Sequence, residues 1–138
     1  MKKLILFLCA FFCGAFVFAK SVNVEIGGKN YKLNLAETGA AESFVSSVLG
    51  KNLDMVKYGG FEFYTYTALN AAASDEQTSF YKAGHVYYNL DFNAISVAYA
   101  DHNLGSYKAV EIGEFADKSV CAALKNLSGR NVFVFNAE

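Results

Sequence analysis

The chain has 138 residues, 54% of them hydrophobic, and it contains 13 Phe and 9 Tyr but no Trp and no Pro. Its formal net charge of −1 excludes the strongly basic surface that binding to nucleic acid or anionic lipid would require. A chain of this length is expected to form one domain around one modest core.

The first residues have the layout of a secretory signal peptide. The start is positively charged, an apolar run covers residues 4–18, and the small Ala19 stands before Lys20. This pattern is typical of export followed by cleavage, and the run is short for a membrane span. We expect a signal peptide over residues 1–19 and a single mature domain over residues 20–138, periplasmic or secreted, without a stable membrane span. An uncleaved N-terminal anchor is the alternative.

Cleavage would change both the charge and the cysteine content. It removes two of the 12 basic residues and none of the 13 acidic ones, which leaves 10 against 13 and a net charge of −3. Of the three cysteines only Cys121 remains, so no disulfide can form within the mature chain. Cys121 stands among apolar residues, which predicts a buried small side chain and not a reactive thiol.

The mature domain is predicted to begin with a β-hairpin and a helix. Residues 22–26 and 31–35 alternate with period two, and a Gly-Gly-Lys-Asn turn signal separates them. Thr38 is then suited to cap a helix that stops at Gly50.

An aromatic region follows the helix. Residues 52–58 alternate again and predict a strand with Leu53, Met55 and Lys57 on one face. Beyond Gly59 and Gly60, residues 61–69 could continue this strand after a bend, and residues 69–79 read as a loop with at most one helical turn.

The last third alternates between strands and turns. Residues 85–90 and 94–100 predict a second hairpin, and residues 107–113 a further strand. Residues 115–125 have helical spacing, and residues 131–135 close the chain with a strand. The total of about seven or eight strands and two short helices predicts a mainly-β, closed or nearly closed barrel, because closure removes exposed edges.

Three segments carry a likeness to a known family. VEIGGKNYKLNLAET, MVKYGGFE and KAGHVYYNLDFNAISVAYADHNLGSYKAVEIGEF follow one another in the order seen in the prokaryotic cyclophilin-like domain family, which the chain resembles over residues 22–135. The resemblance implies an eight-stranded barrel with two helices covering its ends. It does not extend to the catalytic residues of prolyl isomerases, which use an arginine beside phenylalanine and Gln-Gly-Gly segments. Here the only arginine is Arg130, and no Gln-Gly-Gly segment occurs.

Tyr58-Gly59-Gly60-Phe61-Glu62 is the first candidate for a site. Paired glycines allow positive φ and a close approach of the backbone to a ligand. Glu62 would stand beside aromatic rings, where desolvation raises the pKa of a carboxyl group. The alternative is a β-bulge that only bends a barrel strand, with Glu62 in water.

Residues 99–107 are the second candidate. Tyr99 begins this segment, and His102 lies between Asp101 and Asn103, where a loop histidine could relay protons or bind a ligand anion. The alternative is a hydrophilic turn between strands. The other histidine, His85, is interpreted as structural or solvent-facing. Neither histidine belongs to a recognisable zinc pattern, so we expect no metal and no cofactor.

Three functions of different classes remain open. The leading hypothesis is an exported, at most weakly catalytic barrel that binds a small molecule or an extended peptide in an aromatic-lined cleft. The second is a peptidyl-prolyl isomerase without the usual arginine, and the third is an interaction module that pairs through an exposed strand edge. Catalytic residues stay unassigned, and the cleft is predicted to involve Tyr58, Gly59, Gly60, Phe61, Glu62, Tyr99 and His102.

Overall fold

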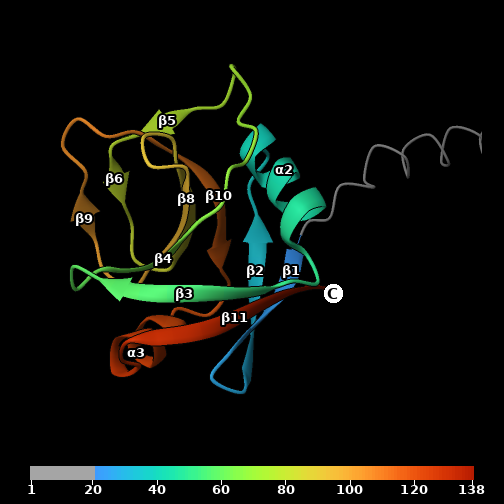
Figure 1. Ribbon diagram of the computed structural model, residues 1–138, viewed down its shortest axis with the longest axis vertical. Coiled ribbons are helices and arrows are strands. Elements are labelled where there is room, and N and C mark those ends of the chain that lie inside the picture. Colours follow the sequence, from blue (N-terminus) through green and yellow to red (C-terminus); the bar gives the residue numbers. More distant parts are fainter. Residues whose placement is uncertain (1–20) are drawn as a thin grey trace, which may run out of the picture.

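The structure is a computed structural model, and it describes residues 21–138. The predicted signal peptide over residues 1–19 lies outside them. The elements, in chain order (Figure 1), are β1 (Ser21–Ile26), β2 (Lys29–Leu35), α2 (Gly39–Val48), β3 (Asn52–Tyr58), β4 (Glu62–Tyr66), β5 (Gln77–Thr78), β6 (Phe80–Tyr81), β7 (His85–Asn89), β8 (Ala94–Ala98), β9 (His102–Asn103), β10 (Ala109–Phe115), α3 (Ser119–Asn126) and β11 (Arg130–Ala137).

Eight of the strands close into an antiparallel barrel. Their order around it is β1–β11–β3–β4–β8–β7–β10–β2, and β2 pairs again with β1. The closing pair is short, because β10 meets β2 only over residues 113–115. Outside the barrel, β5 pairs with the start of β10, and β6 pairs with β9 as a separate ribbon. The prediction of a mainly-β, eight-stranded barrel with two helices is confirmed.

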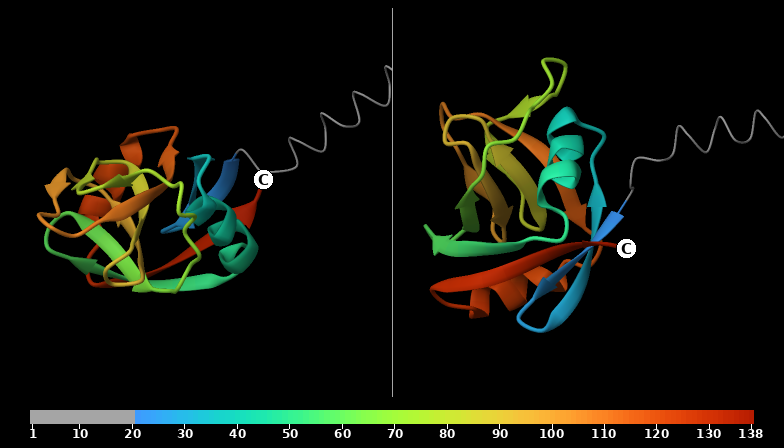
Figure 2. Two further views of the ribbon diagram at one scale, coloured as in Figure 1. Left: turned by 90° about the horizontal axis from the view of Figure 1, so that it is seen from above. Right: turned by 45° about the vertical axis from the view of Figure 1, so that its right-hand side comes forward.

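The core fills the barrel because inward residues alternate with outward ones along each strand. On β4 and β8, for example, Phe63, Ile95 and Val97 point inward and are fully buried. The two helices lie on opposite sides of the barrel (Figures 1 and 2) and add side chains to the same core. Among residues 21–138, no helix has both the length and the apolar character that a membrane span requires.

Two side chains hold the start of α2. The predicted cap is confirmed, since Thr38 Oγ1 accepts a hydrogen bond from the Ala41 amide at 3.0 Å. Asp75 adds a second cap from the distant loop: its carboxylate accepts from the amides of Gly39 (2.7 Å), Ala40 (3.0 Å) and Ala72 (2.9 Å). Partial desolvation acts to raise the pKa of Asp75, but these three donors together outweigh it and hold the pKa below its ordinary value.

The structure corrects the interpretation of Gly59 and Gly60. They do not bend one strand but reverse the chain between β3 and β4, with φ of +68° and +77°. The Phe61 amide donates to the Tyr58 carbonyl across this turn, and Tyr58 then pairs with Glu62. Positive φ at both central positions is the geometry of the tight hairpin turns that glycine favours.

The second helix also differs from its prediction. It begins at Ser119 and not at residue 115, because Phe115 is the last residue of β10 and pairs there with Leu33. Cys121 in this helix is half-buried against the core and not fully buried, and desolvation raises the pKa of its thiol. The two-residue strands β5, β6 and β9 were not predicted, since two residues are too few to display a period.

Candidate functional site

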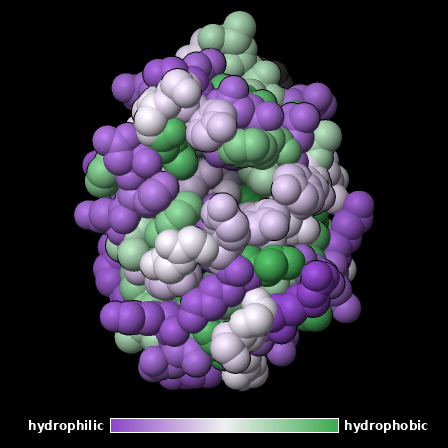
Figure 3. All heavy atoms as spheres, turned by 60° about the vertical axis from the view of Figure 1, so that its left-hand side comes forward, coloured by the Kyte–Doolittle hydropathy of each residue, from purple (hydrophilic) through white to green (hydrophobic). Residues whose placement is uncertain are grey.

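A cleft of about 670 Å³ opens on the outer face of the barrel. Its floor is the outward side of β4, β8 and β7, and its far wall comes from β6, β9 and the loop after β9. Figure 3 shows this face of the molecule, hollowed near its centre. The volume falls in the range of small-molecule sites. We call it the outer cleft.

Tyrosines form the wall on the β3–β4 side. Tyr58 stands opposite Glu62 in the strand pairing, and its ring centroid lies 6.0 Å from that of Tyr64, with the two planes at 88°. Tyr66 continues the row, 5.4 Å from Tyr64. Across the opening, Phe92 packs edge-on against Tyr107 at 4.7 Å. Aromatic rings therefore border the cleft on two sides.

Phe61 joins this hairpin to the β6–β9 ribbon. Its ring stacks on His102, with centroids 3.7 Å apart and planes at 6°. It also packs 6.2 Å from Tyr81, which is 1% exposed and stacks on Tyr87 at 4.6 Å. The Phe61 carbonyl accepts a hydrogen bond from the Tyr99 amide at 2.8 Å. This small outer core, formed by Phe61, Tyr81, Tyr87, Ala98 and Ala109, holds the ribbon against the barrel.

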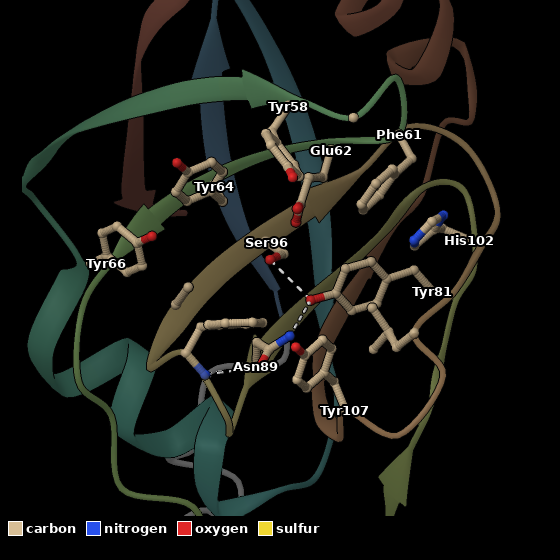
Figure 4. A pocket seen from close by; sticks show the side chains of 14 residues that line it. Tyr58, Phe61, Glu62, Tyr64, Tyr66, Tyr81, Asn89, Ser96, His102 and Tyr107 are labelled. Atoms are coloured by element: carbon tan, nitrogen blue, oxygen red, sulfur yellow. Dashed lines mark hydrogen bonds between the residues drawn. The ribbon is translucent and has the colours of Figure 1, made fainter.

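A chain of hydrogen bonds crosses the floor of the cleft (Figure 4). The Asn89 amide donates to Tyr81 Oη at 3.3 Å, and the Tyr81 hydroxyl donates to Ser96 Oγ at 3.0 Å. Ser96 in turn acts on the carboxylate of Glu62, whose pKa its hydroxyl group lowers. Both donors in this chain therefore point the same way, which suits a negative charge at its end.

Glu62 carries the only carboxylate among the side chains that line the cleft. Figure 4 shows it projecting between Tyr58 and Ser96. Desolvation raises the pKa of Glu62 above its ordinary value of 4.5, and the Ser96 hydroxyl offsets this only in part. Desolvation first, and then Tyr66 and the charge of Glu62, raise the pKa of Tyr64 as well. The cleft thus resists further negative charge.

This raised pKa predicts how Glu62→Gln changes stability with pH. Between 4.5 and the raised value the folded state holds a proton that the unfolded state has lost, so the stability of the native protein falls as pH rises through this window. Above it the cost of burying the charge is fully present. We expect Glu62→Gln to leave the melting temperature nearly unchanged below pH 4.5 and to raise it by a few degrees at neutral pH.

Thermal denaturation monitored by circular dichroism across this pH range tests the expectation. Glu25→Gln is the matched control, because Glu25 is an exposed residue of β1, remote from the cleft. A Glu62→Gln protein that gains no stability at neutral pH relative to this control would show that Glu62 is adequately solvated or paired.

The cleft brings together five of the seven residues predicted for it. Tyr58, Gly59, Phe61, Glu62 and His102 all line it. Gly60 lies in the turn but does not reach the cavity.

Tyr99 faces the other side of the sheet. It continues the inward alternation of β8, packs 6.0 Å from Phe63 in the core and lies 5.4 Å from Lys57 Nζ. The structure therefore removes Tyr99 from the cleft.

Several cleft residues were missed in the sequence. The alternation of side chains along a strand could have identified Tyr64 and Tyr66, because residues 62, 64 and 66 of one strand must share a face. No local signal marked Ser96, Asn89 or Tyr81. Ser96 and Asn89 sit in strands that are otherwise buried, and Tyr81 reaches the cleft through the unpredicted ribbon. Phe92 and Ala94 also line the cleft without a prediction, whereas Leu104 and Tyr107 belong to the second candidate segment, residues 99–107, although neither was singled out.

A second cluster of titratable groups lies between β7 and β10. His85 Nδ1 is 3.1 Å from Glu111 Oε2, and His85 Nε2 is 3.6 Å from Glu114 Oε2. The three residues have the types that bind metals, and their ligand atoms lie within 4.8 Å of one another. However, Lys118 Nζ already lies 2.7 Å from Glu114 Oε2, and the two imidazole nitrogens face different carboxylates. These contacts connect β7 with β10 and with Lys118 at the start of α3, and they give His85 a structural role.

Comparisons with known proteins bear on the barrel as a whole. Neither the curated proteins nor the solved structures include a match to this chain. Among protein families, the cyclophilin-like family matches residues 24–135, which is most of the chain and includes every strand that lines the cleft. The chain therefore belongs to the cyclophilin-like family.

Proposed function

We propose that this protein is an exported binding protein whose outer cleft takes a small molecule or a short extended peptide. The observation that carries the proposal is the composition of the cleft: aromatic walls surround a polar floor that holds one half-buried carboxylate. Small-molecule sites combine apolar walls with a few oriented polar groups in this way. Tyr58 and Tyr66 are 60% and 69% exposed, and such exposed rings at a cleft favour a binding role over a purely structural one.

Titration with a panel of metabolites and short peptides tests this proposal. The protein has no Trp, so its intrinsic fluorescence comes from tyrosine, and several of the nine tyrosines border the cleft. We expect at least one compound to change this signal saturably and Tyr58→Ala to weaken its binding about tenfold, the usual scale for an aromatic contact. Phe80→Ala is the matched control, since Phe80 is also exposed but lies outside the cleft. A panel without any binder would count against the proposal.

The isomerase hypothesis makes a different prediction. An X-Pro bond isomerises faster when a cation hydrogen-bonds the proline nitrogen as resonance is lost, and no Arg or Lys is among the residues lining the cleft. Arg130 instead pairs with Asp54 on β3 at 2.7 Å. In a protease-coupled isomerisation assay we therefore expect no acceleration above background. If the protein accelerates isomerisation and Phe61→Ala or His102→Ala abolishes the acceleration, the protein is an isomerase and not only a binding protein.

A further inference from the structure

We propose that the ligand of the outer cleft is an organic cation, an alkylated or methylated ammonium group, with Glu62 as its counter-ion and Tyr58 and Tyr64 as the aromatic faces around it. This inference rests on the proposed binding function and adds the chemical class of the ligand.

The first observation is that Glu62 lacks an ionic partner. Within residues 21–138 the ion pairs all lie elsewhere, between His85 and two glutamates, Lys118 and Glu114, and Arg130 and Asp54. A carboxylate withdrawn from water is normally paired with a positive charge. None of the residues lining the cleft is Lys or Arg. The one histidine there, His102, stacks on Phe61 and forms no ion pair with Glu62 in the described part of the chain. A cation for Glu62 would therefore come with the ligand.

The lysine nearest to Glu62 along the chain forms its hydrogen bonds elsewhere. Lys57 precedes Tyr58 and points to the opposite side of the sheet, where its ammonium donates to the carbonyls of Lys125, at 2.7 Å, and Leu127 at the end of α3. It also lies within 6 Å of the rings of Phe63 and Tyr99. The alternation of β3 thus directs this half-buried side chain to the opposite face of the sheet, away from Glu62.

The second observation is the aromatic corner beside the carboxylate. Tyr58 is the cross-strand partner of Glu62, and Tyr64 is the next residue along β4 on the same face. The centroids of their rings lie 6.0 Å apart, with the two planes at 88°. Figure 4 shows the Tyr58 ring beside the Glu62 carboxylate and Tyr64 next to Tyr58. Perpendicular aromatic rings attract a cation through their quadrupoles, and they are the usual surroundings of quaternary ammonium groups.

The same groups do not suit a metal ion. Ca²⁺ takes six to eight oxygen ligands, and Mg²⁺ takes six in octahedral geometry, usually waters with one or two carboxylates and phosphates. Glu62 is the single carboxylate lining the cleft. Asn89 Oδ1 is already engaged by the amides of Asp91 and Phe92, at 2.9 and 3.1 Å. A large, weakly hydrated ammonium group requires only one counter-charge and apolar contact, and the corner provides both.

An isosteric pair of probes tests the inference. Choline and 3,3-dimethylbutan-1-ol have nearly the same shape and differ in the charge of the central atom. We expect choline to bind at least tenfold more tightly, on the scale of a desolvated cation–π contact with a counter-ion. In Glu62→Gln the preference should fall to the part that the aromatic rings supply, while the alcohol binds as before. In Tyr64→Ala both compounds should bind more weakly, because this change removes a wall. Glu25→Gln should leave the preference intact.

The outcomes separate the two proposals. If the alcohol binds as tightly as choline or more tightly, the inference about charge is wrong, although the cleft still binds a ligand. A panel in which only neutral or anionic compounds bind would have the same meaning. If choline fails to bind at millimolar concentration while other compounds bind at the cleft, the cation is wrong and the binding function stands. If no compound of any charge binds, both fail.

Discussion

Gly113→Val is expected to lower the free energy of unfolding by about 3 kcal/mol, the upper part of the usual range for overpacking. Gly113 lies where β10 crosses from β7 to β2 and closes the barrel, and the register of β10 against β7 shifts at this point. A Cβ atom there would lie 2.5 Å from the Asn34 carbonyl oxygen and 3.2 Å from the Leu33 side chain. The oxygen belongs to the backbone of the neighbouring strand, so it cannot move aside without opening the barrel.

The sign of this effect is informative because strand propensity predicts the reverse. Valine is favoured over glycine in strands, so a loss of stability could come only from the steric clash of the new side chain with the Asn34 carbonyl oxygen and Leu33. Glu25→Val is the matched control, since it places the same side chain at an exposed strand position. Urea denaturation monitored by circular dichroism gives both free energies. If Gly113→Val were as stable as Glu25→Val, the packing between β10 and β2 at residue 113 would have room for a side chain, in contradiction to the structure.

Gly59→Ala is expected to destabilise the protein by about 2–4 kcal/mol and to disturb the outer cleft. The left-handed backbone at this position contributes about 1–2 kcal/mol of that cost. The rest comes from Phe61, whose Cε2 atom would lie 2.4 Å from the new Cβ. Phe61 is held between the His102 ring and Tyr81, so its displacement disrupts the stack that fastens the β6–β9 ribbon and costs further energy as overpacking does.

Gly60→Ala is the natural control for this experiment. Its φ of +77° is also left-handed, but a Cβ at this residue would meet nothing within 4 Å. We expect only the backbone cost, about 1–2 kcal/mol, and unchanged binding of any ligand found for the cleft. Urea denaturation of the two variants side by side isolates the contribution of Phe61. Equal losses would mean that the Phe61 ring can move without consequence, and that the glycine pair serves the turn alone.

Local pattern was sufficient for most of the barrel. Alternation along residues 22–26 and 31–35 predicted the first hairpin, and Thr38 predicted the start of α2, because both signals depend only on residues close together in the sequence. The same parity, applied to β4, groups Glu62 with Tyr64 and Tyr66. Applied to β8, it puts Tyr99 on the inward side with Ile95 and Val97, so the misplacement of Tyr99 was avoidable.

Closure and the far wall of the cleft were decided by the tertiary structure. The β6–β9 ribbon joins residues 80–81 to residues 102–103, and no period is visible in strands of two residues. Tyr81 reaches Ser96 and Asn89 only because this ribbon packs on the outside of the barrel. A strand's own sequence determines which of its side chains share a face, through the geometry of the extended chain. Which faces then meet depends on contacts between distant segments, whose packing no local pattern encodes. For this reason the sequence by itself identified the residues from Tyr58 to Glu62 and His102, whereas the fold brought them together with Tyr81, Asn89 and Ser96.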